Sequence, residues 1–538
     1  MKNAAEPARH AKLGRAKTMA SRARRTYPYR RPPELDGNSV RYPVVIVGAG
    51  PSGLALALEL AGFGISALIL ERLNTLSAGS RAICWAKRTL EICDRLGVGE
   101  RMRDKGVTWN VGRVFVGDAE SPLYTFDLLP DRDQKYPAFV NLQQYYAEQF
   151  LIDALELRGG PGIRWLNEVV DVAPGADSVQ LTVSTPDGCY RLECEHLIAA
   201  DGHRSPVRSL LGLDFDGRAF EDSFLIADVK MQADYPAERR FWFDPPFNPG
   251  QTALMHKQAD DVWRIDFQMG PGIDREAALE EENVERKVRS FLGPDAEFEY
   301  EWVSLYTFQC RRMSRFVHDR VIFVGDAAHL VSPFGARGGN GALQDVDNLG
   351  WKLAYVKLGL ADETLLETYD AERVHGAEEN LTHSSRSTDF MTPKHAAASA
   401  FRDAVLELAR EHEFARAFVN SGRLSVPCVF DRSPLTTPDV EPFEGAVRPG
   451  AVCPDAPVEK DGRPDWLLHH LGGAFVGLWF SHDDDPAPDG FAVLAAGEVP
   501  LRLVKVTRDS VLPPGLVDGS GSAWRRYDAE EGTFYLVR

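Results

Sequence analysis

Residues 42–62 read Tyr-Pro-Val-Val-Ile-Val-Gly-Ala-Gly-Pro-Ser-Gly-Leu-Ala-Leu-Ala-Leu-Glu-Leu-Ala-Gly, a β-type run followed by a glycine turn and an apolar helix start. The β-branched run Val44–Val47 is typical of a buried parallel strand. In the pattern G-x-G-x-x-G, Gly48 permits a tight turn, Gly50 lets a pyrophosphate approach, and Gly53 lets helix and strand pack closely. The free N–H groups of the following helix favour phosphate. The stretch therefore predicts a dinucleotide-binding βαβ unit.

A second apolar run, Ile65–Leu70, ends in Glu71. This acid lies roughly 20 residues beyond the glycines, the distance at which a carboxylate binds ribose hydroxyls in dinucleotide-binding folds. We therefore place Glu71, and Arg72 beside it, among the cofactor-binding residues. The alternative is a plain βαβ turn with Glu71 at the surface.

The composition is that of a globular protein with two or three domains. The chain has 538 residues, of which 44% are hydrophobic and 26% are charged. No uninterrupted apolar run is long enough to cross a bilayer. The seven cysteines include no C-x-x-C and no Cys/His cluster of zinc spacing. We therefore expect reduced thiols, no metal site and a cytoplasmic location.

The net charge of −18 is unevenly distributed along the chain. Residues 1–41 carry eleven Lys or Arg against three Asp or Glu, a net charge of +8, which leaves −26 for the remainder. An acidic body argues against nucleic acid as a partner. The basic arm has the Arg-rich, acid-poor character of a transit peptide, but a solvated flexible tail is the simpler interpretation.

We expect three parts along the chain. A flexible N-terminal extension (1–41) precedes a nucleotide-binding domain (42–430), into which a mostly antiparallel, substrate-binding β-sheet is inserted at about 215–303. A linker rich in Pro and Gly leads to a final domain (440–538). A homodimer is the assembly we consider. Three runs in the final domain are predicted to be strands: Phe475–Phe480, Phe491–Ala495 and Leu501–Val506.

Two further motifs place acids after apolar strands. Asp201-Gly202 follows one such run, with Arg204 and Arg208 downstream, and Gly325-Asp326 ends another. The carboxyl ends of parallel strands are where α/β sheets hold ligands. Both acids are also compatible with ordinary turns. The glycine-rich loop Pro333–Gly341 then leads into a helix whose N-terminus would favour negative charge.

In this order the three motifs resemble the class A flavoprotein monooxygenases, the aromatic hydroxylases of the p-hydroxybenzoate hydroxylase fold. The resemblance covers about residues 42–425. It implies an α/β fold, in which a Rossmann-like FAD-binding domain carries an inserted, mostly antiparallel β substrate domain. Residues 440–538 are similar to the thioredoxin-like domain of the phenol hydroxylase and 3-(3-hydroxyphenyl)propionate hydroxylase branch. That region lacks C-x-x-C, so we expect no redox role for it.

The resemblance also implies roles for individual residues. Glu71 would hold the adenosine ribose of FAD, and Asp326 the ribityl hydroxyls. Asp201 and Gly202 would lie near the FAD and the route of NAD(P)H. The other implied roles are contacts of Arg81 and Gln144 with FAD phosphates and sugar, backbone N–H groups of Gly339 and Asn340 at the pyrimidine edge of the flavin, and Pro333 over the flavin ring. From the residues alone, Arg81 and Gln144 are equally compatible with ordinary surface side chains.

The implied reaction is hydroxylation of a small phenolic substrate. NADPH or NADH would reduce the flavin, O2 would add to give a C4a-hydroperoxide, and its distal OH would pass to the ring. Two alternatives stay open. The first is another FAD enzyme on this fold, such as a halogenase, a reductase or a Baeyer–Villiger oxygenase. The absence of Trp-x-Trp-x-Ile-Pro disfavours the halogenases. The second alternative is a non-catalytic flavoprotein that serves as an interaction module.

The sequence departs from the resemblance at one catalytic position. Phenol hydroxylases carry an acid just upstream of a stretch like Arg88-Thr-Leu-Glu91, and the aligned residue here is Ile83. The base is therefore unassigned. By location, its candidates are His256, Asp266, Gln268 and Tyr306, each also compatible with a structural role. The aromatic segment Phe241–Phe247 suggests a pocket for a ring, and Arg239, Arg240 and Arg264 are candidates for binding a substrate carboxylate.

Overall fold

The computed structural model describes residues 25–538 apart from 39, 78, 161, 271, 421–424, 441–446, 483–486 and 509–514. Most of the predicted basic arm, residues 1–24, lies outside the described residues. None of the helices in the described part of the chain combines the length and apolar character that a bilayer crossing requires. That part also brings together no group of three or more His, Cys, Asp or Glu side chains suited to a metal ion.

The central sheet is parallel and carries the glycine turn at its middle strand. Strand β1 (Arg41–Val47) lies between β2 (Ala67–Glu71) and β11 (Gly188–Ala199), in the order β18-β11-β1-β2-β8. After β1 the chain adds β2 and β8 on one side of it and then β11 and β18 on the other side. Such a reversal of the strand order creates the crevice where these sheets bind ligands. The remaining strands are β8 (Ile163–Trp165), β9 (Glu168–Pro174), β10 (Val179–Thr185), β17 (Val317–His318) and β18 (Val321–Phe323).

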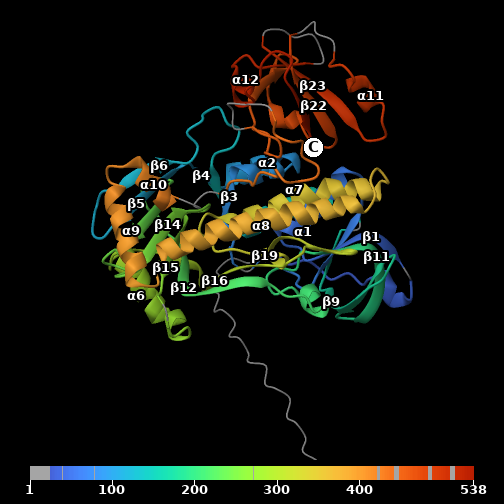
Figure 1. The fold of residues 1–538 in the computed structure, drawn as a ribbon. Helices are drawn as coiled ribbons and strands as arrows, with labels where there is room; N and C mark the ends of the chain where they lie inside the picture. The colour runs from blue at the N-terminus through green and yellow to red at the C-terminus, as the bar shows by residue number, and fades with distance from the viewer. Residues whose placement is uncertain are drawn as a thin grey trace, which may run out of the picture.

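Helices cover this sheet because its strands are apolar on both faces. Val44, Val45 and Ile46 are completely buried, and α1 (Pro51–Gly62) follows the turn. Helix α1 packs against α7 (Arg337–Lys357) and α4 (Gln144–Arg158), and α7 runs beside α8 (Thr364–Met391) (Figure 1). Around this core lie α2 (Lys87–Arg95), α3 (Gly99–Lys105), α5 (Pro206–Leu210), η1 (Pro33–Asp36), η3 (Gly325–Ala327) and a small sheet of β3 (Cys84–Ala86), β7 (Phe139–Asn141) and β4 (Val107–Trp109).

The predicted inserted sheet is present and is larger than expected. It runs β19-β16-β12-β15-β14-β13-β5-β6 and is antiparallel except where β13 pairs with β5. A helix that was not predicted, α6 (Glu281–Leu292), packs its Val284 and Val288 against one face of the sheet. The strands are β5 (Val111–Val116), β6 (Tyr124–Asp127), β12 (Asp216–Lys230), β13 (Arg239–Phe243), β14 (Thr252–Lys257), β15 (Val262–Gln268), β16 (Glu299–Arg312) and β19 (His329–Leu330), with η2 (Ala277–Leu279) before α6.

Helices α9 (Ala396–Leu408) and α10 (Glu413–Asn420) lie by the opposite face of this sheet, near its β5–β6 edge (Figure 1). Val405 of α9 and Val419 of α10 are buried in one apolar cluster with Phe241 and Val114 of the sheet. The sheet is therefore covered on both faces, by α6 on one and by the helices after α8 on the other.

The C-terminal region forms a separate sheet above α2 and α7 in Figure 1. Two of its predicted strands exist, but the prediction for Phe491–Ala495 was wrong because this run forms helix α11. A short apolar run does not distinguish helix from strand, and here Val493 is 78% exposed. The thioredoxin-like assignment stays a prediction. The elements are β20 (Pro457–Lys460), β21 (Arg463–Trp466), η4 (Leu467–His470), β22 (Phe475–Phe480), α11, β23 (Leu501–Thr507), β24 (Gly515–Val517), α12 (Ser522–Arg526) and β25 (Phe534–Val537).

Candidate active site

The three glycines of the turn meet different surroundings. Gly48 has φ +107°, and a Cβ there would stand 2.5 Å from the carbonyl oxygen of Ala200. A Cβ on Gly53 would stand 2.1 Å from the carbonyl oxygen of Gly48. Around Gly50, with an ordinary φ of −78°, a Cβ would meet no atom within 4 Å. Protein packing therefore accounts for two of the glycines, whereas the third faces open space, as expected where a pyrophosphate approaches.

Glu71 supports the glycine turn from the end of β2. Its carboxylate accepts hydrogen bonds from the amides of Ala49 and Leu73, both at 2.9 Å. The carboxylate thus lies beside the turn, at the carboxyl edge of the sheet. Arg72 is exposed, and no hydrogen bond or ion pair in the described region joins it to the other predicted site residues.

Asp326, Tyr306 and Arg81 come together although they are far apart in the sequence. Asp326 lies in η3, directly after β18, and its side chain is accessible. The surrounding protein nevertheless raises the pKa of this carboxyl, with partial compensation from His329 and Arg81. Burial, and secondarily the charge of Asp326, raises the pKa of Tyr306 to about 12. Asp326 is thus an exposed carboxylate just after β18, close enough to Arg81 and Tyr306 to act on them electrostatically.

Arg81 also contacts the segment after β11. Its guanidinium lies 3.3 Å from Nδ1 of His203, and burial followed by Arg81 and two other arginines lowers the pKa of His203 to about 4. The imidazole is therefore neutral and accepts from Arg81. Arg208 ties the same segment to η3 by donating to the carbonyls of His203 and Ala327, each at 2.9 Å.

The neighbouring Asp201 caps the helix that follows it. Its Oδ2 accepts from the amide of Val207 at 3.0 Å, whereas its Oδ1 is buried without a partner in the described region. Burial raises the pKa of this carboxyl. Since a Cβ on Gly48 would stand 3.1 Å from the Cα of Asp201, the second motif packs directly on the glycine turn.

Gln144 positions the loop that carries Arg81. Its Oε1 accepts from the amide of Ala82 at 3.1 Å, and its Nε2 donates to Ser77 at 3.0 Å and Glu148 at 2.8 Å. Sequence reasoning missed Glu148, which accepts from Ser77 and is almost completely buried. Its spacing of four residues from Gln144 on one helix was the available signal.

The glycine-rich loop ends at the N-terminus of α7. The helix begins at Arg337, so Gly339 belongs to the first turn, whose N–H groups lack helical partners. Asn340 is the next residue, and its side chain accepts from Ala86 and donates to the carbonyl of Cys84, both at 2.9 Å. The side chain of Asn340 thus fastens β3 to α7. Pro333 is exposed in the loop.

One face of the inserted sheet points toward this site. Strand pairing aligns Phe241, Leu254 and Asp266 across β13, β14 and β15. In the neighbouring row His256 pairs with Arg264, and Arg264 with Asp228. Because side chains alternate along strands, these residues share one face. The other face carries the core residues Ala253, Met255, Trp263, Ile265 and Phe267.

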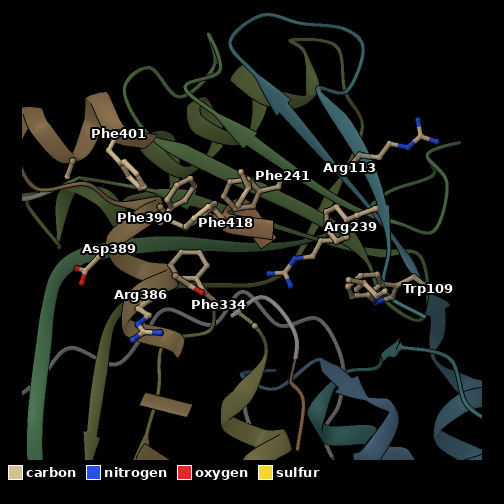
Figure 2. A pocket seen from close by; sticks show the side chains of 17 residues that line it. Trp109, Arg113, Arg239, Phe241, Phe334, Arg386, Asp389, Phe390, Phe401 and Phe418 are labelled. Carbon is tan, nitrogen blue, oxygen red and sulfur yellow. The ribbon is translucent and has the colours of Figure 1, made fainter. Parts of the chain in front are cut away.

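A cavity of about 500 Å³ lies between this face, the glycine-rich loop, the C-terminal end of α8 and the helices that follow it (Figure 2). Seven of the side chains that line it are aromatic: Trp109, Phe126, Phe241, Phe334, Phe390, Phe401 and Phe418. Of the predicted aromatic segment, Phe241 lines the cavity, whereas Trp242 and Phe247 pack on the core face. The sequence did not assign α9 and α10 to the site, although Phe401 and Phe418 come from these helices.

Only one of the three arginines suggested for a substrate carboxylate is suitably placed. Arg264 already forms a bidentate pair with Asp228, at 2.7 and 2.8 Å, which disfavours it among the three. Arg240 pairs with Glu238 at 2.8 Å and alternates to the other face. Arg239 lines the cavity, reaches toward Phe334 in Figure 2, and has no hydrogen-bond or ion-pair partner in the described region.

A buried hub, formed by Asp345 and its three hydrogen-bond donors, holds η3 and α7 together. Asp345 of α7 is completely buried and accepts from the amide of Gly325 at 2.9 Å, from His329 at 2.7 Å and from Arg373 at 2.6 Å. Burial alone would raise its pKa, but His329 and Arg373 outweigh that effect and lower it. The hub fixes the backbone immediately before Asp326.

The groups around the glycine turn fit FAD. Space beside Gly50 suits a pyrophosphate, carboxylates stand at the ends of β2 and β18, and the N-terminus of α7 would favour an anionic ring edge. Gly325 lets η3 lie close to α1, since a Cβ at this position would stand 2.6 Å from Ser52 Oγ in α1.

Comparisons with known proteins agree with this geometry. A family model described as FAD binding domain matches residues 41–384. The 6-methylpretetramide 4-monooxygenase of Streptomyces rimosus is 32% identical over 534 residues, which cover 94% of this chain and 90% of that protein. The 12-dehydrotetracycline 5-monooxygenase/anhydrotetracycline 6-monooxygenase of Streptomyces rimosus subsp. rimosus is 34% identical over 354 residues, 62% of this chain and 67% of that protein.

Among solved structures, the flavin-dependent monooxygenase PieE, in complex with FAD and substrate, superposes with a TM-score of 0.77. It is 23% identical and covers 93% of this chain and 94% of its own, a likeness that bears on the fold alone. The family model spans well over half of the chain. The chain therefore belongs to the FAD-binding domain family and is a FAD-dependent monooxygenase of the class A aromatic hydroxylase type.

Proposed function

We propose that this monooxygenase hydroxylates a phenolic ring, ortho or para to its hydroxyl group, on a substrate larger than a single phenol. The aromatic cavity of about 500 Å³ carries this proposal, because it borders Phe334 and Gly335 in the loop before α7. Pockets of about 300–1,000 Å³ accommodate drug-sized ligands. The names of the relatives, with anhydrotetracycline and 6-methylpretetramide, support a multi-ring substrate.

The proposed roles divide the chain into a cofactor side and a substrate side. Gly48, Gly50 and Gly53 would admit the pyrophosphate of FAD, Glu71 the adenosine ribose, and Asp326 the ribityl chain. When bound, FAD supplies the oxygen-transfer chemistry, with NAD(P)H and O2 as co-substrates. The protein orients the substrate and excludes water. The remaining proposed assignments are Arg72, Arg81, Gln144, Asp201, Gly339 and Asn340 for FAD, and Pro333 beside the reacting ring.

A turnover screen tests this function. The probes are 3-hydroxyphenylpropionate, 1-naphthol and alizarin, which contain one, two and three rings. We expect at least one multi-ring probe to accelerate flavin reduction by NADPH or NADH in stopped flow and to yield a hydroxylated product by mass analysis. Rapid reduction indifferent to every probe, with hydrogen peroxide as the only product, would instead favour a plain oxidase or reductase. Lactone formation from a cyclic ketone would favour a Baeyer–Villiger oxygenase.

Arg239→Met tests the substrate side. Arg239 is the cavity cation that we expect to meet an oxyanion of the substrate, so the variant should raise KM for the best probe at least ~10-fold, about 1.4 kcal/mol. Steady-state kinetics provide the measurement. Arg113→Met is the matched control, because Arg113 also lines the cavity but pairs with Glu238 at 2.8 Å. Equal effects of the two substitutions would remove Arg239 from the binding site.

We further propose that the C-terminal domain has no thiol chemistry. Burial raises the pKa of the Cys453 thiol, and Cys453 is not bonded to another cysteine. A thiol with a raised pKa is a poor nucleophile. Cys453→Ser should therefore leave kcat and KM unchanged. A large loss of turnover in a variant with a normal circular dichroism spectrum would contradict this assignment.

Cytoplasmic location and a homodimer complete the proposal. The first rests on the cysteine usage and the second is the simplest symmetric assembly. Light scattering of the purified protein would give the oligomeric state directly.

A further inference from the structure

Ile83, at the aligned position, supplies no proton acceptor for hydroxylation of a phenol. A phenol becomes more electron-rich as its hydroxyl proton leaves, so a positioned base accelerates attack by its ring. Ile83 occupies the position where phenol hydroxylases carry an acid, and its side chain is apolar and buried. The base must therefore come from another element.

Strand register places one carboxylate on the cavity side of the inserted sheet. Asp266 of β15 pairs with Leu254 of β14, which in turn pairs with Phe241 of β13. Phe241 lines the cavity, and the three side chains share a face. Oδ1 of Asp266 is buried and has no hydrogen-bond partner in the described region. The buried Oδ1 is therefore an acceptor without a hydrogen-bond partner, on the sheet face that borders the cavity.

The charged groups around Asp266 come from every strand beside it. Arg264 on its own strand is committed to Asp228 of β12. Arg239 of β13 acts on Asp266 electrostatically and has no ion-pair partner in the described structure. The other titratable groups of this cluster are His256 of β14 and Cys84 of β3, whose Sγ lies 3.8 Å from His256 Nδ1.

These surroundings distinguish Asp266 from the other candidates. Burial raises its pKa to about 6, against partial compensation from Arg264. The carboxylate is thus mainly ionised at neutral pH and is a stronger base than an ordinary aspartate. Burial, Arg239 and Arg264 hold the pKa of His256 far below its usual range. Tyr306 keeps its own proton, since its pKa is about 12.

Resting on the proposed function, we propose that Asp266 accepts the proton of the substrate's phenolic hydroxyl and that Arg239 stabilises the resulting phenolate. The O–H bond of the phenol breaks, its electron pair stays on the phenolate oxygen, and an O–H bond forms on the Asp266 carboxyl. No oxidant takes part in this step. The proton returns to solvent after the product leaves.

The test compares pH profiles of kcat/KM for the best of the three probes. In the wild-type protein kcat/KM should fall as the pH drops through about 6, because protonated Asp266 cannot accept a proton. Asp266→Asn should lower hydroxylation by about 10²–10⁴-fold and abolish this acidic limb. Formate should restore part of the rate in Asp266→Ala, and Asp266→Glu should retain part of it.

Asp261→Asn is the matched control, since Asp261 lies just before β15 and pairs with Lys257 at the surface. FAD content should be normal in every variant, and Asp261→Asn should also keep the wild-type rate of hydroxylation. An unchanged limb and rate in Asp266→Asn would overturn the assignment, as would a loss that neither formate nor glutamate relieves. If the wild-type protein hydroxylates none of the probes, the proposed function fails, and this inference fails with it.

Discussion

Gly50→Val is expected to fold normally and to purify without FAD. The backbone at Gly50 has an ordinary φ of −78°, and a Cβ there meets no protein atom within 4 Å. A β-carbon therefore strains nothing in the protein itself, but the side chain of valine occupies the space that the pyrophosphate needs. We expect FAD affinity to fall at least ~100-fold, about 2.8 kcal/mol. The bound flavin absorbance of the purified protein and a titration with FAD give the result.

Gly53→Ala is the contrasting variant within the same turn. Its Cβ would stand 2.1 Å from the carbonyl oxygen of Gly48, a backbone atom that cannot move away cheaply. We therefore expect Gly53→Ala to lose folded protein, whereas Gly50→Val loses only flavin. A Gly50→Val protein with a full complement of FAD would show that the pyrophosphate lies elsewhere.

Asp345→Asn is expected to destabilise the protein strongly. Asparagine keeps the shape of the side chain but removes the negative charge that faces Arg373, whose side chain is 1% exposed. Breaking a buried pair from one side costs about 3–5 kcal/mol, because a buried charge is left uncompensated. Thermal unfolding followed by circular dichroism should show the loss, and FAD binding should weaken because Asp345 also holds Gly325.

The control for Asp345 is an exposed ion pair on α8. Glu378 pairs with Arg312 at 2.7 Å, and its side chain is 56% exposed. Glu378→Gln should cost less than about 1 kcal/mol, as surface pairs do. If Asp345→Asn unfolds no earlier than Glu378→Gln, the hub does not hold this region together.

Local signals in the sequence predicted the nucleotide-binding half well. The turn at Gly48–Gly53, the acid at Glu71 and the acid after β18 each combine a strand end with a residue type that the ligand chemistry requires. Their packing against one another was not needed for the prediction. The C-terminal run Phe491–Ala495 shows the limit of such signals, since its apolar character fits a strand and a short helix equally well.

The residues of the substrate side could not be predicted from local patterns in the sequence, because their roles depend on tertiary contacts. Arg264 and Arg239 look alike in the sequence, but the register of β12 beside β15 gives Arg264 a carboxylate and leaves Arg239 facing the cavity. The cavity itself is assembled from β5, β13, the loop at Phe334 and helices α8 to α10. Segments so distant in the chain meet only through the tertiary fold.

We expect the protein to place one atom of O2, as a hydroxyl group, on a phenolic ring held in the aromatic cavity. The direct test is turnover of the best probe under ¹⁸O2 in unlabelled water, followed by mass spectrometry. The product should carry one new hydroxyl group that contains ¹⁸O. An unaltered probe with all consumed oxygen recovered as hydrogen peroxide, or a new hydroxyl that carries only oxygen from water, would contradict this expectation.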